Sequence, residues 1–463
     1  MKRLASLCLP LSLMVPLAVL AAEQDRPAVK YERYSSRVLI LRACETYGDQ
    51  VVAIATAKGI VVIDTGIAPS LTAEYRKIIE REFGRKDFAY VVNTHGHYDH
   101  TNGNQVFADA TVVAHERALE LMTDFDRNRT GTVARERGRV AGWKEHLKAL
   151  DPQSEEAKRQ LDSIMLYSLM ADDVEKKFLL TLPSITFNDR LTLDLGDVTL
   201  RLVYFGQGRH TGDDILIHCP EEKLVFSGDL FYYDSMWISH TPSFEVDRWI
   251  TALNYVLQDP AAVQYVVDTH HRKMSREFLD LFRDYLVALH NDLVEAKRQG
   301  LTYQAVEKQF AYDPRFKYLE KSGIDSKKLS REHQTNVRYL WYQVSGTQSA
   351  AQVMESTLAA SGMQALAGKI REMRATADDN YYFDEREINR LGYQLLSQNR
   401  TKEAIEIFRA NVEAFPESWN VYDSLAEACM TDNQKDLAVR YYRKSLELNP
   451  ENNNAKEMLK RME

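Results

Sequence analysis

The stretch Tyr90–Thr101 reads YVVNTHGHYDHT, and it places three histidines and an aspartate within six residues. Its two consecutive valines predict a strand that runs into a polar loop. Side chains two positions apart in an extended loop share a face, so His95 and His97 can converge on one cation, while Asp99 and His100 face a second position. Imidazole nitrogens and carboxylates are groups that borderline divalent metals bind. The stretch therefore predicts a metal site, and the alternative is a solvated polar loop.

Length and composition predict a soluble globular protein of two or three domains. The chain has 463 residues, of which 44% are hydrophobic and 27% charged, and its formal net charge is -8. This acidic balance gives no electrostatic basis for binding nucleic acid or an anionic membrane surface. Of the four cysteines, Cys8 lies in the N-terminal stretch 1–22. The other three, Cys44, Cys219 and Cys429, are too widely spaced for a disulfide framework or a thiolate metal cluster, and we expect each in a core.

Residues 1–22 have the pattern of an export signal. Lys2 and Arg3 make a basic start, an apolar stretch follows, and small residues offer a cleavage position near Ala21. A membrane helix is the alternative, but two prolines interrupt the stretch, and a span needs about 20 clean apolar residues. We therefore expect a processed protein that is periplasmic or secreted and has no membrane span.

Apolar runs alternate with helical patterns through the next part of the chain, which predicts a layered α/β architecture. The first group of expected strands is 37–42, 51–55, 60–64, 88–92 and 111–114, with a helix over 70–83. The second group is 185–187, 191–195, 198–204, 215–219, 223–226 and 265–267. Histidines or aspartates follow several of these strands, and ligands gathered from strand ends of a rigid scaffold make a preformed metal site.

Four of these segments together resemble the metallo-β-lactamase superfamily over roughly residues 31–300. They are HGHYDH at 95–100, GRHTGDD at 208–214, SGDLFYY at 227–233 and the histidine at 270. The resemblance implies an αββα sandwich with a pair of zinc ions at one edge, followed here by an all-α region.

The resemblance also implies a ligand set. The first metal ion would be held by His95, His97 and His210, the second by Asp99, His100 and His270, with Asp229 bridging the two. Asp64, in the Asp-Thr-Gly turn, would support a ligand without binding the metal. Where family members carry proline-glycine-histidine-glycine, this chain has Asp-Thr-His-His, so His271 is the alternative to His270.

Elementary chemistry agrees with such a site. Three neutral histidines leave a zinc position open for water, whose pKa the metal lowers to about 7. The metal-bound hydroxide can then attack an electrophilic carbonyl. Asp99 is also a catalytic candidate, because its second oxygen can orient the nucleophile or pass a proton to the leaving atom. We expect two Zn2+ per chain, with iron or manganese as alternatives.

Within the resemblance, Asp229 is the residue that narrows the class of reaction. A cysteine stands at this position in the thiolate-type metallo-β-lactamases, and a carboxylate makes the site more similar to those of glyoxalase II, lactonases and other general hydrolases. Tyr232, Trp237 and His240 are the expected substrate contacts, because polar and aromatic side chains just past a ligand can line a pocket. The alternative for these aromatic residues, and for Phe231 beside them above all, is packing in the core, and the alternative for His240 is simple solvation. The charged helical tract 115–180 is expected to be an insertion that partly covers the site, or else an uninvolved surface hairpin.

The C-terminal part is expected to be helical, with a linker region at 301–385 and repeats at 386–463. Four pairs of residues recur 34 positions apart, which is the period of tetratricopeptide helix hairpins. The pairs are Leu391 and Leu425, Ala404 and Ala438, Phe408 and Tyr442, and Pro416 and Pro450. The repeats would bind a protein partner or mediate self-association; the alternative is a structural appendage.

The predicted function is therefore that of an exported dinuclear zinc hydrolase, with a catalytic domain over 23–300. Its substrate would be a small ester, lactone, thioester or β-lactam. Phosphodiester or sulfate ester hydrolysis is the alternative within the enzyme class, and His210 weakens the sulfate reading. A binding or assembly protein that works through its repeats is the alternative outside it.

Overall fold

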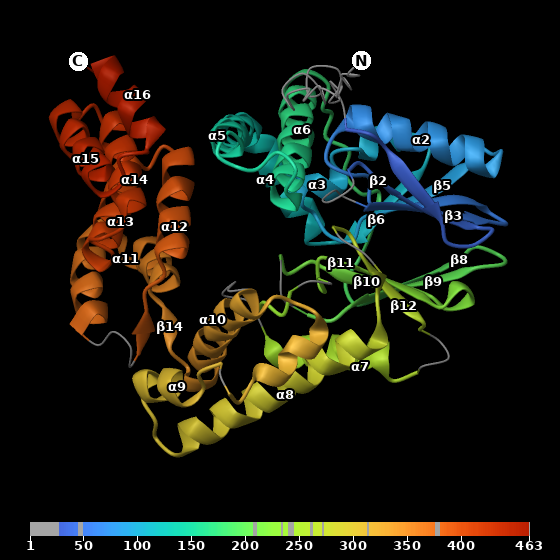
Figure 1. Ribbon diagram of the computed structural model, residues 1–463. Helices are drawn as coiled ribbons and strands as arrows, with labels where there is room; N and C mark the ends of the chain where they lie inside the picture. Colours follow the sequence, from blue (N-terminus) through green and yellow to red (C-terminus); the bar gives the residue numbers. More distant parts are fainter. Residues whose placement is uncertain are drawn as a thin grey trace, which may run out of the picture. The chain divides into compact units, whose positions relative to one another are not determined.

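The computed structural model describes residues 27–44, 50–206, 211–232, 235–238, 245–259, 263–270, 273–312, 314–375 and 380–462 (Figure 1). Contacts divide the chain into two compact units. Unit 1 is Met1–Asp234 with Thr251–Leu279, and unit 2 is Ser235–Ile250 with Asp280–Glu463. The expected export signal lies outside the described residues, and the domain boundaries expected at 300 and 385 stay predictions.

Unit 1 contains a seven-stranded sheet, called sheet A, in the order β1 to β7. Its strands are β1 Lys30–Arg33, β2 Val38–Arg42, β3 Gln50–Thr56, β4 Gly59–Ile63, β5 Phe88–Val92, β6 Thr111–His115 and β7 Ile185–Phe187. The first four strands pair antiparallel, and β4 to β7 pair parallel. Because β4, β5 and β6 run in the same direction, their carboxyl ends lie at the same edge of the sheet.

Sheet B has six strands in the order β13, β12, β11, β10, β9, β8. They are β8 Arg190–Asp194, β9 Thr199–Tyr204, β10 Ile215–Cys219, β11 Leu224–Gly228, β12 Tyr265–Asp268 and β13 Lys273–Met274. Only β11 and β12 pair parallel. In both sheets, most strands lie within one or two residues of the ranges that the sequence predicts. Strands β1 of sheet A and β13 of sheet B have no counterpart among the predicted ranges.

Successive side chains of a strand point to opposite faces of the sheet, and both faces of sheet A are buried. Ile40, Ile54 and Ile63 pack against side chains of sheet B in one core. Leu41 and Ala53 belong to a second core beneath the helices on the opposite face. A strand buried on both faces reads as a continuous apolar run, which is what makes β4 visible in the sequence.

Helices cover the outer faces of both sheets (Figure 1). Helix α2 (Pro69–Phe83) lies on sheet A, and its Leu71, Tyr75 and Ile79 are buried there. Helix α7 (Val246–Leu257) lies against sheet B, where Tyr255 Oη is 3.1 Å from His218 Nδ1 of β10. The layers therefore form the expected αββα sandwich, and the fold prediction is confirmed.

The tract between β6 and β7 folds as three helices, α4 Ala118–Arg127, α5 Arg129–Leu147 and α6 Glu155–Lys176. Helix α6 belongs to the core of sheet A, since its Tyr167, Met170 and Val174 share that apolar cluster. Its buried Asp173 accepts hydrogen bonds from the Ser70 backbone N–H (2.6 Å) and the Ser70 hydroxyl (2.7 Å) in the first turn of α2. The tract is thus part of the sandwich's packing, unlike an uninvolved surface hairpin.

Unit 2 is mostly helical. Its elements are α9 Tyr303–Gln309, α10 Ser326–Ser345, α11 Ala350–Ala375, α12 Glu385–Ser397, α13 Thr401–Ala414, α14 Trp419–Thr431, α15 Lys435–Leu448 and α16 Asn453–Met462, together with the two-stranded ladder of β14 Gln348–Ser349 and β15 Tyr381–Tyr382. Helix α8 (Arg276–Arg298) runs from unit 1 into unit 2. No helix among the described residues is long and apolar enough to span a membrane.

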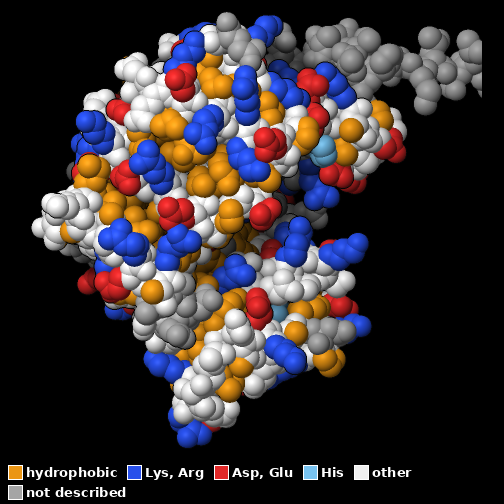
Figure 2. Space-filling view, turned by 90° about the vertical axis from the view of Figure 1, so that its left-hand side faces the viewer, with side chains coloured by type: hydrophobic (Ala, Val, Ile, Leu, Met, Phe, Trp, Pro, Cys, Tyr) orange, Lys and Arg blue, Asp and Glu red, His pale blue; other side chains and the backbone are white. Residues whose placement is uncertain are grey.

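The five C-terminal helices form two hairpins and a closing helix, as the 34-residue period predicts. Leu391 and Leu425, Ala404 and Ala438, and Phe408 and Tyr442 are all buried in one cluster that also includes Met354 and Leu358 of α11. On the face in Figure 2, cationic and anionic side chains are interspersed rather than gathered into a patch of one sign.

Candidate metal centre

The stretch that leaves β5 becomes a tight turn followed by the short helix α3 (Tyr98–Thr101). His95 and His100 are buried and His97 and Asp99 are half-buried. The His95 ring lies 4.9 Å from that of His97 and 4.1 Å from that of His100, measured between centroids. The turn thus brings its three imidazoles together, and His100, which the alternation assigns to a second position, lies nearer to His95 than His97 does.

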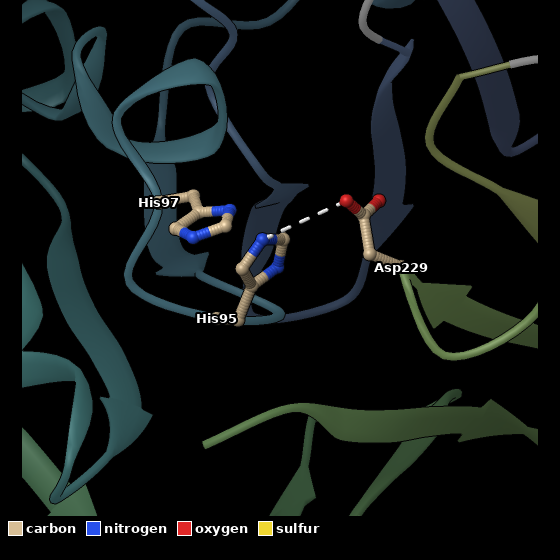
Figure 3. Close-up of side chains that lie close together, drawn as sticks. All are labelled: His95, His97 and Asp229. Atoms are coloured by element: carbon tan, nitrogen blue, oxygen red, sulfur yellow. Dashed lines mark ion pairs between the residues drawn. The ribbon is translucent and has the colours of Figure 1, made fainter. Parts of the chain in front are cut away.

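The ligand atoms gather in two groups. In the first group, one ligand atom from each of His95, His97 and Asp229 lies within 4.8 Å of the others. Figure 3 shows the His95 ring directed toward the Asp229 carboxylate, with 3.9 Å between Nε2 and Oδ2. The two histidines follow β5 of sheet A and Asp229 follows β11 of sheet B, so the group joins the ends of both sheets.

The second group is Asp99, His100 and His270, whose ligand atoms also lie within 4.8 Å of one another. Asp99 Oδ2 is 3.7 Å from His100 Nε2 and 3.9 Å from His270 Nε2. Asp229 stands between the groups, because its carboxylate oxygens are 3.2 Å from His270 Nε2 and Oδ1 is 3.7 Å from His100 Nε2. A carboxylate so placed can bridge two ions.

Several hydrogen bonds fix the position of His100. Its Nδ1 is 3.0 Å from the buried Asp64 Oδ2, and its carbonyl accepts the Thr65 backbone N–H (2.8 Å) and hydroxyl (3.0 Å) and the Asn93 amide (3.3 Å). Asp64 has the left-handed φ of 53° and also accepts the Thr94 N–H and hydroxyl. An acceptor on one ring nitrogen orients the other toward the site.

Asp229 is oriented by two hydroxyls. Thr269 Oγ1 donates to its Oδ1 at 2.5 Å, and Tyr232 Oη donates to its Oδ2 at 2.8 Å. The preceding Gly228 has φ 52°, and a Cβ there would lie 2.7 Å from the Thr94 side chain. Only glycine allows the end of β11 to approach the histidine turn this closely.

The electrostatics of the second group favour positive charge. Burial by itself would raise the pKa of Asp99, but the charges of His100, His97 and His270 outweigh it, and the pKa is lowered. For His100, burial lowers the pKa, but Asp99 and the neighbouring carboxylates raise it well above its ordinary value. These carboxylates therefore stabilise a cation in their midst, whether a proton or a metal ion.

The side chains fit divalent metal ions. Among the described residues, the buried His100 Nε2 has no hydrogen-bond partner, although it faces two carboxylates at 3.7 Å. A buried polar nitrogen without a partner is costly, and a bound cation would satisfy it. Nitrogen and carboxylate oxygen donors suit zinc and other borderline metals.

The remaining expected residues stay predictions or belong to another part of the chain. His210, His240 and His271 lie outside the described residues, so the third ligand of the first group and the choice between His270 and His271 stay predictions. Trp237 belongs to unit 2, where its backbone N–H donates to Ser235 Oγ at 3.1 Å. Phe231 is fully buried, in keeping with a core role.

Several supporting residues carry no signal in the sequence. The Thr94 hydroxyl contacts His95 Nδ1, the Thr269 hydroxyl donates to Asp229 and the Asn93 amide donates to the His100 carbonyl, but threonine and asparagine in turns are common without such a role. Asp213 and Asp214 are also buried near the turn: Asp213 Oδ2 accepts the Gly96 N–H at 2.7 Å, and Asp214 Oδ1 is 3.9 Å from His95 Nδ1. The two consecutive aspartates of the GRHTGDD segment are the sequence signal that could have drawn attention to them.

Comparison with known proteins gives the family. Residues 49–270 match the model of the metallo-beta-lactamase superfamily, and residues 420–452 match that of a tetratricopeptide repeat. A type 2 metallo-beta-lactamase from Bacillus cereus is 23% identical over 216 residues, which cover 46% of this chain and 64% of the relative. The match thus spans less than two thirds of that relative's length.

Solved structures show partial similarity. A metallo-beta-lactamase from Pontibacter korlensis aligns with 56% of this chain and 99% of its own, at 19% identity and a TM-score of 0.40. A sec-alkylsulfatase from Pseudomonas sp. aligns with 94% of this chain and 64% of its own, at 14% identity and a TM-score of 0.49. Residues 49–270 are therefore a metallo-beta-lactamase superfamily domain, and residues 420–452 match a tetratricopeptide repeat.

Proposed function

We propose that the chain is an exported metal-dependent hydrolase that binds two zinc ions and cleaves a small ester, lactone, thioester or β-lactam. The observation that carries this proposal is the pair of adjacent ligand groups, which together hold six described side chains. A structural zinc site needs four ligands and closes its coordination shell, so six ligands in two groups favour a reactive site. Membership of the superfamily supports the same reading.

The side chains have distinct proposed roles. His95, His97 and His210 would hold one ion, Asp99, His100 and His270 the other, and Asp229 both. Bound zinc would supply Lewis acidity and a water of lowered pKa. Asp99 has two oxygens, so it can hold an ion with one and orient the attacking water or carry its proton with the other.

Substrate contacts belong to the same proposal. Tyr232 presents its hydroxyl beside the site, 2.8 Å from Asp229 Oδ2, so the phenol can donate to a substrate oxygen when it turns from the carboxylate. Trp237 and His240 are proposed contacts on sequence grounds. The choice of a carbonyl substrate rests on Asp229, a carboxylate at the position where thiolate-type enzymes carry cysteine.

The test is metal content measured together with hydrolysis. We expect purified protein to hold about two zinc ions per chain and to cleave a chromogenic lactone, thioester or cephalosporin. Removal of the metal with a chelator should abolish the activity, and added zinc should restore it. Protein that binds no divalent metal at a saturating concentration would refute the proposal. Metal-dependent cleavage of phosphodiesters or sulfate esters alone would replace the carbonyl substrate with those classes.

A further inference from the structure

The turn between the first two histidines is held by a residue that lies just before strand β10 of sheet B. The backbone N–H of Gly96, which lies between His95 and His97, donates to Asp213 Oδ2 at 2.7 Å. Gly96 is buried, and the Asp213 side chain is fully buried. A hydrogen bond from a backbone N–H to a buried carboxylate is charge-assisted, and such bonds are short and strong.

The second oxygen of Asp213 holds a different segment. Asp213 Oδ1 accepts the Thr211 hydroxyl, which also donates to Asp214 Oδ2 at 3.0 Å. Two residues further on, the Ile215 N–H donates to the Thr94 carbonyl at 3.0 Å, on the other side of His95. The start of β10 is therefore joined to the histidine turn at two points that flank His95.

The turn has little room to move away from this contact. A Cβ at Gly96 would lie 2.9 Å from the Ala118 carbonyl oxygen and 2.9 Å from Leu121 Cβ. Helix α4 therefore closes one side of the turn, and Asp213 holds it from another. The second group is fixed by different residues, namely Asp64, Thr65 and Asn93 behind His100.

We propose that Asp213 is a positioning residue that sets the metal affinity of the first group. By holding Gly96 it fixes the relative directions of the His95 and His97 rings, and through Thr211 it ties them to the segment that follows His210. This inference rests on the proposed function, because it assumes that the first group binds a metal ion. Asp213 is not a member of the two candidate ligand groups among the described residues, so it would act through the position of its carboxylate.

Two variants separate position from charge. Asp213→Glu keeps the charge but displaces the carboxylate by one methylene, whereas Asp213→Asn keeps an oxygen acceptor for Gly96 and can donate its amide to the Thr211 hydroxyl. We expect Asp213→Glu to weaken one of the two zinc sites at least about tenfold, the range seen for partners that orient metal ligands. Asp213→Asn keeps the position of the acceptor and loses only the charge assistance, so its loss of affinity should be clearly smaller than that of Asp213→Glu. Zinc affinity would be measured by competition with a chromogenic chelator, and the coordination of each site by the visible spectrum of the cobalt-loaded protein.

Asp173→Ala is the matched control, since Asp173 is also buried and also accepts a backbone N–H, but on α2. It should lower stability and retain both zinc sites. The inference fails if Asp213→Glu binds both ions as tightly as the unchanged protein, if Asp213→Asn loses as much as Asp213→Glu, or if Asp173→Ala loses a site equally. Thr211→Val leaves the Asp213 carboxylate intact and should show a smaller loss of zinc affinity at the same site. This variant replaces Asp213→Glu as the test if Asp213→Glu does not fold. An unchanged zinc affinity in Thr211→Val would also count against the inference. Unchanged protein that binds no metal would instead overturn the proposed function.

Discussion

At the scale of single residues, the convergence of the candidate metal ligands could be predicted because their spacing is local. Six residues hold His95, His97, Asp99 and His100, and a turn leaving a strand is enough to converge them. The roles of Thr94, Thr269 and Asp213 could not be predicted, since they depend on which distant groups these side chains contact. Asp213 becomes visible only when β10 is seen to start beside the histidine turn.

The first prediction concerns His97. His97→Ala should lower the zinc content by at least one ion per chain and reduce metal affinity by about 100-fold or more, because loss of a ligand costs at least as much as loss of its supporting partners. His146→Ala is the control, as this exposed histidine on α5 contacts only the Gln160 amide at 2.8 Å among the contacts described. Zinc analysis of both variants checks the prediction, and full metal content in His97→Ala would contradict the role given to the turn.

At the scale of elements, strong apolar runs were predicted well and context-dependent elements were not. Strand β5 was expected at its exact bounds, whereas β1 reads KYER and is exposed along its length, so it has no apolar pattern to recognise. The insertion was expected as one helical tract, and its three helices follow from packing on α2 and sheet A. Its link to α2 through Asp173 leaves no mark in local sequence.

The second prediction concerns that link. Asp173→Ala should lower the free energy of unfolding by about 1–3 kcal/mol, because the Ser70 N–H in the first turn of α2 loses its buried acceptor. Its neighbour Asp172 pairs with Arg137 at the surface, so Asp172→Ala should change stability by about 0.5 kcal/mol or less. Denaturant unfolding of the two variants gives the comparison. Equal effects would show that Asp173 does not cap α2.

The third prediction concerns His333 in α10. Burial lowers its pKa to about 4, and its ring nitrogens contact Tyr285 Oη at 2.9 Å and the Phe310 carbonyl at 2.7 Å. In the unfolded chain the histidine pKa is near 6.5, so this ring binds a proton below that pH, whereas the folded ring stays neutral until the pH approaches 4. The contribution to stability is therefore complete above pH 6.5 and is lost as the pH falls toward 4.

Replacement of His333 by glutamine removes this titration. Between pH 7 and pH 4.5 the unchanged protein should lose about 2 kcal/mol more of its unfolding free energy than His333→Gln does. Denaturant unfolding at the two pH values measures the difference. Identical pH dependence in both proteins would show that the ring does not titrate on unfolding.

At the scale of the whole molecule, the sequence predicts a boundary between a metal-binding part and a repeat part. The contacts in the structure divide the chain at other residues. All six metal-facing residues described belong to unit 1, whereas Ser235–Ile250 belongs to unit 2 although it follows Asp229 closely. Such an exchange of a segment has no local signature, because it is decided by which long-range contacts are better. The 34-residue period, in contrast, is a local pattern repeated, and it predicted the hairpins.

The fourth prediction concerns the repeats. Removal of residues 386–463 should keep kcat/KM for a small substrate within a factor of about ten, equivalent to 1.4 kcal/mol, because the ligand groups lie in unit 1. Solubility should fall, since Met354 and Leu358 of α11 lose the cluster they share with the repeats. Steady-state assays of the soluble fraction measure this. A folded, zinc-loaded truncation without activity would show that the repeats shape the site.

The central claim is that distant strand ends of unit 1 hold two metal ions side by side. Anomalous X-ray diffraction at the zinc edge, on crystals of the zinc-loaded protein, tests it most directly. We predict two peaks, one enclosed by His95, His97 and Asp229 and the other by Asp99, His100 and His270. A single peak, or zinc bound away from these side chains, would contradict the claim.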